Sequence, residues 1–204
     1  MSAPPVTSAP PTPTTPAAAI TTRIAAAGAV AGSAAGAPDT VWVPLASGVL
    51  VLAAGAMSLA TGKPWLFAAL GPTAVMIAHA PGHPTTRFQS VVLGHAVGAA
   101  CGYLALLLCG VDVGSSLGQL GGPSTARVWA SAFAVVLTAL VQPPLRAWHP
   151  PAAATALLIT LGATRLSSSR TALALLGGVL VVAILGEWLQ RARLRATRGS
   201  GGRG

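Results

Sequence analysis

The stretch Trp148-His149-Pro150-Pro151-Ala152-Ala153-Ala154-Thr155-Ala156-Leu157 lies where one apolar segment ends and another begins. Proline has no amide hydrogen and is tolerated in the first turn of a helix, so the double proline marks a helix start. The small side chains that follow would let another backbone approach the new helix closely. A second proline, Pro72 in Leu70-Gly71-Pro72-Thr73-Ala74-Val75, opens a similar apolar run 79 positions earlier. Two short, proline-opened helices are therefore expected.

The composition indicates an integral membrane protein. Hydrophobic residues make up 53% of the 204 residues and charged residues only 7%, whereas about 25% of the residues in a soluble globular domain are charged. The three acids are Asp39, Asp112 and Glu187. So few charged side chains could not cover a water-exposed surface, and most of the surface is expected to face lipid.

The net charge of +9 does not indicate nucleic-acid binding. Five of the twelve basic residues lie in the segment 191–204, at Arg191, Arg193, Arg195, Arg198 and Arg203. Basic residues that flank membrane helices are typical of the cytoplasmic side, where they meet anionic lipid headgroups. No motif for binding RNA or DNA accompanies them. Membrane lipids, and no nucleic acid, are therefore the expected partners of these charges.

The chain divides into three segments. Residues 1–40 are rich in Pro, Thr and Ala, a composition typical of a disordered tail. A transmembrane domain, 41–190, and a basic cytoplasmic tail, 191–204, follow. The domain contains six apolar runs, uncharged apart from Glu187 in the last: Val41–Ala60, Pro64–Ala80, Phe88–Gly110, Val128–Gln142, Trp148–Ala163 and Thr171–Trp188. A spanning helix needs about 20 residues, so the second, fourth and fifth runs are short. We predict an all-α polytopic transmembrane helical bundle.

Loop charges predict that both termini are cytoplasmic. With six spans, the termini share a side with loops 81–87 and 143–147, and that side carries eight basic residues. The opposite side carries four, namely Lys63, Arg127, Arg165 and Arg170. Positive charge accumulates in cytoplasmic loops. We expect a multi-pass protein located in the bacterial inner membrane.

The spacing of prolines and glycines predicts an internal repeat. A shift of 79 positions places Pro64 on Pro143, Pro72 on Pro151, and Gly98 on Gly177. Each half then has three spans, and an odd number of spans inverts the second half in the membrane. The chain has 17 prolines and 24 glycines, so chance coincidence among unrelated hydrophobic helices is the alternative.

An inverted three-plus-three repeat predicts a small anion as the ligand. Secondary transporters of this design place broken helices in matching positions near the bilayer midplane. The amide groups at the start of a broken helix need partners where water is absent, and the helix dipole favours a negative one. The two proline-opened helices would supply such a site.

The same residues resemble a known family. His149-Pro150-Pro151 with the following Ala/Thr-rich run resembles the signature of the HPP family of integral membrane proteins. Gly71-Pro72-Thr73-Ala74, the Pro-containing loop to Arg87, and Gly94-His95 support the resemblance, which covers about residues 40–190. Some family members are associated with nitrite transport. The resemblance therefore implies a transporter of nitrite or a similar small anion.

The candidate substrate-binding residues cluster around the two helix starts. His149 is either an interfacial histidine beside Trp148 or a group that gates or protonates with the substrate. His95 lies deep in an apolar run, where it is either a functional residue or a neutral imidazole bonded to a carbonyl. Hydroxyls after the prolines could contact an anion or bond to their own helix. The full set is Gly71, Pro72, Thr73, His95, His149, Pro150, Pro151, Ala152, Ala153 and Thr155.

No enzyme, metal or cofactor site is expected. His79 and His83 are four residues apart, but Pro81 and Gly82 would break a helix between them. No paired carboxylates, nucleophile with a base, or phosphate-binding loop occurs. We predict a transporter of a small monovalent anion, with nitrite as the first candidate, that forms a homo-oligomer. The alternatives are an anion channel and a non-transporting membrane scaffold or sensor acting through its basic tail.

Overall fold

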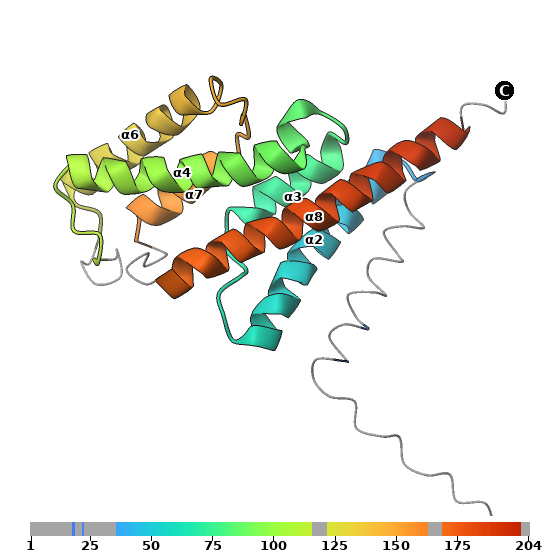
Figure 1. The fold of residues 1–204 in the computed structure, drawn as a ribbon, viewed down its shortest axis with the longest axis horizontal. Helices are drawn as coiled ribbons and strands as arrows, with labels where there is room; N and C mark the ends of the chain where they lie inside the picture. Colours follow the sequence, from blue (N-terminus) through green and yellow to red (C-terminus); the bar gives the residue numbers. More distant parts are fainter. Residues whose placement is uncertain (1–17, 19–21, 23–35, 116–121, 163–168, 201–204) are drawn as a thin grey trace, which may run out of the picture.

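The computed structural model describes residues 18, 22, 36–115, 122–162 and 169–200. Its regular elements within these ranges are all helical, as Figure 1 shows. They are α2 (Asp39–Thr61), α3 (Leu70–His79), the 3₁₀ turn η2 (Pro84–Thr86), α4 (Phe88–Leu108), α6 (Thr125–Val141), α7 (Ala152–Thr160) and α8 (Ser169–Ser200). The all-α prediction is confirmed, and the six α-helices fall on the six apolar runs.

Three of the described helices are long and apolar enough to cross a membrane. These are α2, α4 and the part of α8 from Ala172 to Arg198. The other three are shorter: α3 has 10 residues, α6 has 17 and α7 has 9. They correspond to the second, fourth and fifth runs, so the expected short helices are confirmed. The chain is an integral membrane protein.

Two of the three shorter helices, α3 and α7, have a proline at their start, and we refer to these two below as the short helices. Pro72 occupies the first turn of α3, and Pro151 directly precedes α7. A missing amide hydrogen costs nothing in a first turn, because that turn has no intrahelical acceptor for it. In Figure 1, α3 and α7 start near the middle of the bundle and run toward opposite ends.

Glycines on the long helices allow the short helices to approach them closely. A methyl group at Gly98 on α4 would overlap the carbonyl oxygen of Ala152 at the start of α7. A methyl group at Gly178 on α8 would overlap the carbonyl oxygen of Trp65, in the segment that leads into α3. Four residues further along α4, Gly102 meets Ala156, so α7 runs parallel to α4.

Each short helix packs between helices of both halves of the bundle, where α2, α3 and α4 form the first half and α6, α7 and α8 the second. The short helix α3 packs against α2 and α8, while α7 packs against α6 and α4. Each short helix therefore contacts the first helix of its own half and the third helix of the other. The helices α4 and α8 contact each other and run in opposite directions in Figure 1. This arrangement agrees with a three-plus-three repeat, and the inverted repeat itself stays a prediction.

The basic segment that begins at Arg191 is helical as far as Ser200. Residues 191–200 continue α8, because Arg, Leu and Ala are good helix formers and no proline interrupts them. Arg193 is only 8% exposed, and its guanidinium donates to the Asp39 carboxylate at 2.7 Å. It also lies 5.4 Å from the ring centroid of Trp42. This part of the segment joins the end of α8 to the start of α2. Of the expected N-terminal tail 1–40, residues 1–17, 19–21 and 23–35 lie outside the described residues.

A buried arginine holds the opposite end of the bundle. Arg127 on α6 is 1% exposed, and its guanidinium donates to the carbonyl oxygen of Thr160 at the end of α7. It also donates to Ser115 Oγ at 2.7 Å and to the Ser115 carbonyl oxygen at 3.1 Å, in the loop after α4. Its position between two apolar runs predicted a loop charge. In the structure, it pairs with the Thr160 carbonyl at the end of α7, where the last carbonyls of a helix lack intrahelical donors.

The close approach at Gly98 predicts a stability effect. Gly98→Ala should destabilise the protein by about 1–3 kcal/mol, because the added methyl group would push α4 away from α7. Gly48→Ala on α2 is the matched control, since its methyl group would meet nothing within 4 Å. Thermal unfolding of both variants in detergent measures the difference. Equal melting temperatures would show that the α4–α7 contact is not tight.

Membrane orientation gives a second prediction. In a background where Cys101 and Cys109 are replaced by alanine, Lys63→Cys and Gly114→Cys should react with a membrane-impermeant maleimide in intact cells. Leu145→Cys should react only after permeabilisation, because the charge bias places its loop in the cytoplasm. All three positions are exposed. Labelling of Lys63→Cys and Gly114→Cys from different sides would contradict the arrangement of six helices.

Candidate functional site

Four polar side chains meet where the two short helices begin. They are Thr73 on α3, His95 on α4, His149 in the turn before α7, and Thr155 on α7. None is more than 3% exposed. We call these four side chains the central cluster. Each was a candidate from the sequence, and the structure brings them together from three helices and one turn.

Short hydrogen bonds join the cluster into one chain. His95 Nδ1 lies 2.6 Å from Thr155 Oγ1, and His95 Nε2 lies 2.9 Å from Thr73 Oγ1. Thr73 Oγ1 lies 3.3 Å from His149 Nε2 and donates to the Ala69 carbonyl oxygen at 2.9 Å. The two imidazole rings are 5.1 Å apart between centroids. A polar path therefore runs from α7 through α4 and α3 to the turn before α7.

One end of this path fixes a hydrogen position. His149 Nδ1 lies 2.8 Å from the carbonyl oxygen of Thr85, in η2. A carbonyl oxygen only accepts, so Nδ1 of His149 carries a hydrogen. In the neutral imidazole, Nε2 is then an acceptor that faces the Thr73 hydroxyl.

Gln142 and Gly94 hold His149 in place. The Gln142 side chain is 1% exposed, and its Oε1 accepts the backbone amide hydrogen of His149 at 3.0 Å. Its Nε2 donates to the carbonyl oxygen of Gly94 at 3.3 Å. A side chain at Gly94 would lie 2.6 Å from Cβ of His149, so glycine is required for this approach. Gly94 thus leaves space for His149, and the next residue on α4 is His95, the other histidine of the cluster.

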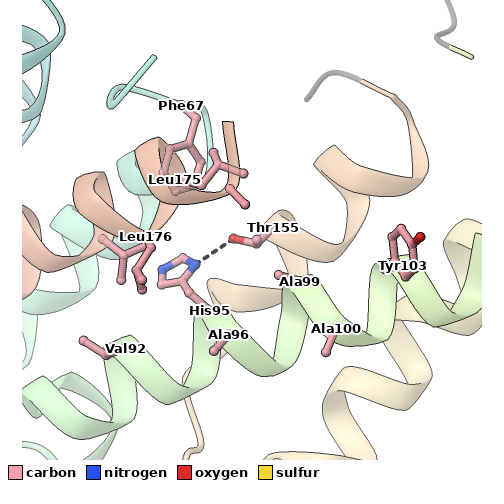
Figure 2. A pocket seen from close by; sticks show the side chains of 12 residues that line it. Phe67, Val92, His95, Ala96, Ala99, Ala100, Tyr103, Thr155, Leu175 and Leu176 are labelled. Carbon is pink, nitrogen blue, oxygen red and sulfur yellow. Dashed lines mark hydrogen bonds between the residues drawn. The ribbon is translucent and has the colours of Figure 1, made fainter. Parts of the chain in front are cut away.

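A cavity of about 320 Å³ between α4 and α8 reaches the cluster. In Figure 2, His95 and Thr155 face it, with Phe67 and Leu175 across from them. The Phe67 and His95 rings lie edge to face, with 6.3 Å between their centroids. The cavity walls are otherwise mostly apolar; the lining residues not yet named are Val92, Ala96, Ala99, Ala100, Tyr103, Ala172, Leu176 and Val179.

The cluster offers hydrogen-bond donors without a carboxylate. All three acids lie elsewhere: Asp39 pairs with Arg193, Glu187 pairs with Arg191, and Asp112 lies in the loop after α4. A hard cation such as Ca²⁺ or Mg²⁺ would need carboxylate or carbonyl oxygens. Imidazoles and hydroxyls that face a cavity instead suit an acceptor ligand such as a small anion. Among the described residues, no three His, Cys, Asp or Glu side chains come together as metal ligands.

The remaining sequence candidates surround the cluster without joining its side-chain hydrogen bonds. Ala152 is fully buried against Gly98, whereas Pro72 and Pro150 are exposed. These candidates are Gly71, Pro72, Pro150, Pro151, Ala152 and Ala153. Sequence reasoning missed Gln142, whose only signal was a polar amide at the end of an apolar run. It also missed the Thr85 carbonyl, because a backbone acceptor has no sequence signal.

The structure corrects the expectation that the amide groups at the helix starts lack partners. Instead, the amides of Ala152 and Ala153 donate to the carbonyls of His149 and Pro150 at 3.0 and 3.1 Å. The amide of Gly71 donates to Ala68 in the same way at 3.2 Å. The turn before each helix satisfies these groups, so an anion would be bound mainly by side chains.

The Gln142 contacts predict a stability effect at the site. Gln142→Leu should destabilise the protein by about 1–3 kcal/mol, because the buried His149 amide and Gly94 carbonyl would lose their partner. Gln89→Leu, an exposed position on α4, is the control. Thermal unfolding in detergent measures both. If Gln142→Leu unfolds at the wild-type temperature, Gln142 does not position His149.

Comparison with known proteins identifies the family of this chain. No curated protein matches the chain, and no solved structure matches it. Residues 32–196 match the family model described as HPP, transmembrane region. This match covers most of the chain and includes every residue of the central cluster. The chain therefore belongs to the HPP family of integral membrane proteins.

Proposed function

We propose that this protein carries a small monovalent anion across the membrane and binds it beside the central cluster. The observation that supports the proposal most is a cavity that ends on His95 and Thr155, within a buried cluster that has no carboxylate. A buried polar group needs a partner, and an ionisable one at this depth is rarely retained for packing alone.

The two short helices favour a negative ligand at this place. Both α3 and α7 begin near the cluster, so the positive ends of two helix dipoles point toward it. The amides are bonded within their turns, but the dipoles remain. Helix starts near the midplane are typical of anion sites in transporters with broken helices. The reciprocal packing of α3 and α7 supports the same design.

Nitrite is the first candidate substrate. Family resemblance supports it, since some HPP members are associated with nitrite transport. Nitrite is small and accepts hydrogen bonds through its oxygens, so it could accept the Thr155 hydrogen once that hydroxyl turns from His95 Nδ1 toward the cavity. The proposal includes an inverted three-plus-three repeat for alternating access, cytoplasmic termini and a homo-oligomer in a bacterial inner membrane. It includes no enzymatic activity and no cofactor.

A flux measurement tests the proposal. Purified protein in liposomes should take up nitrite, compared in parallel with nitrate, formate and chloride. Thr73→Val should lower uptake at least tenfold, because it removes the hydroxyl that joins His95 to His149. Thr138→Val is the matched control, since Thr138 is buried but bonds only to its own helix at Ala134. Equal loss in both variants would point to misfolding rather than to the site.

The same assay distinguishes the alternatives. A carrier saturates with substrate concentration, whereas a channel shows a nearly linear flux. A scaffold would show no flux, and removal of residues 198–204 would abolish its partner binding. That truncation spares Arg193, which contacts Asp39 and Trp42, so the fold should remain intact. Absence of flux for all four anions, from a correctly folded protein, would overturn the proposed function.

A further inference from the structure

The number of hydrogen bonds in the central cluster leaves room for one more hydrogen, and so for a proton as a second ligand. Two neutral imidazoles and two hydroxyls carry one hydrogen each, so the cluster brings four hydrogens. Five hydrogen bonds join its side chains to one another and to two backbone carbonyls: Thr155–His95, His95–Thr73, Thr73–His149, Thr73–Ala69 and His149–Thr85. If each bond had its own hydrogen, the five bonds would need five; with four, the Thr73 hydrogen is shared between two acceptors, the Ala69 carbonyl and His149 Nε2. The geometry therefore accommodates one more hydrogen than the neutral residues supply.

One added proton fills all five bonds. His149 then donates from Nδ1 to the Thr85 carbonyl and from Nε2 to Thr73. Thr73 accepts from both histidines and donates its own hydrogen to the Ala69 carbonyl. His95 donates from Nε2 and accepts the Thr155 hydrogen at Nδ1. Without this proton, the single Thr73 hydrogen must serve two acceptors, the Ala69 carbonyl and His149 Nε2.

The surroundings limit the cluster to a single proton. The two rings are 5.1 Å apart, so two imidazolium charges would repel each other in a buried site. Among the cavity-lining residues, Tyr103 is the only other titratable group. On the η2 side, the His83 ring bonds the Thr85 hydroxyl at 2.8 Å. Arg146, in the loop before His149, is exposed, and none of the three acids contacts the cluster.

We infer that a single proton is the co-substrate of the transported anion and is held by the His95–His149 pair. This inference rests on the proposed function. The cavity supports it independently, because its walls are apolar apart from a few groups. A bare anion loses its hydration there at a large free-energy cost. A proton on the adjacent histidine pair neutralises the anion and removes most of that cost.

The proton balance of one transport step follows from the geometry. When an anion enters, Thr155 turns its hydroxyl hydrogen toward it and frees His95 Nδ1. A hydronium ion on the entry side gives its proton to this nitrogen and leaves as water. The Thr73 hydroxyl then turns from the Ala69 carbonyl to His149 Nε2, passes its hydrogen there and takes the Nε2 hydrogen of His95. Release reverses these transfers, so one anion and one proton leave together and no electrons are exchanged.

The decisive experiment measures charge and protons in liposomes that contain the wild-type protein. Nitrite uptake should acidify the interior by one proton per anion, as read with an enclosed pH-sensitive dye. Clamping the membrane potential with potassium and valinomycin should leave the rate unchanged. Protein-free liposomes correct for diffusion of nitrous acid through the lipid. Nitrite uptake that carries net charge, without acidification, would overturn the inference and leave the proposed function standing.

Two further measurements test the cluster itself. Thr73→Ser keeps the hydroxyl and should retain one proton per anion, whereas Thr73→Val should lose at least tenfold in coupled uptake. Nitrogen NMR of ¹⁵N-histidine protein in lipid nanodiscs, without anion, reports the same site independently of flux. Acidification should produce one imidazolium shared by His95 and His149. Two imidazolium rings in that pair, or none while the protein stays folded, would overturn the inference. Loss of flux for every anion would overturn the proposed function with it.

Discussion

The structure depends on the requirement that backbone polar groups find partners where no water is available. A helix that starts inside a membrane protein would leave its first amides unpaired. Here the turns before α3 and α7 supply the acceptors, as in the bond from the Ala152 amide to the His149 carbonyl. Proline reduces the demand further, because Pro72 and Pro151 have no amide hydrogen. Short helices can therefore begin in the interior, and the polar cluster forms where they do.

The sequence predicted the helices well because proline, glycine and hydrophobicity act locally. The expected run Phe88–Gly110 became Phe88–Leu108, and the short runs gave α3 and α7. Gly98 lies against Ala152 at the start of α7, and Gly177 lies against the Trp65 ring in the segment before α3. The continuation of α8 as far as Ser200, beyond the run that ends at Trp188, was not predicted. Its arginines were assigned to lipid on charge alone, although their helix propensity is high.

The candidate site was predictable in its residues but not in its bonding. Thr73, His95, His149 and Thr155 are polar residues in apolar runs, so their position made them candidates. Their mutual contacts depend on how three helices pack, which no local pattern contains. The partners of His149 show the limit most clearly. One is a carbonyl in η2 and the other is the Gln142 amide, and both are set by tertiary structure.

Gly94 and His95 show how packing and chemistry are coupled in this protein. Gly94 must remain without a side chain so that His149 can lie against α4. That same approach brings His149 within reach of Thr73, and thus into one hydrogen-bonded chain with His95. A larger residue at position 94 would separate the histidines without altering either of them. The distance between the two rings, and with it their ability to share one proton, is therefore determined by a glycine that carries no chemistry of its own.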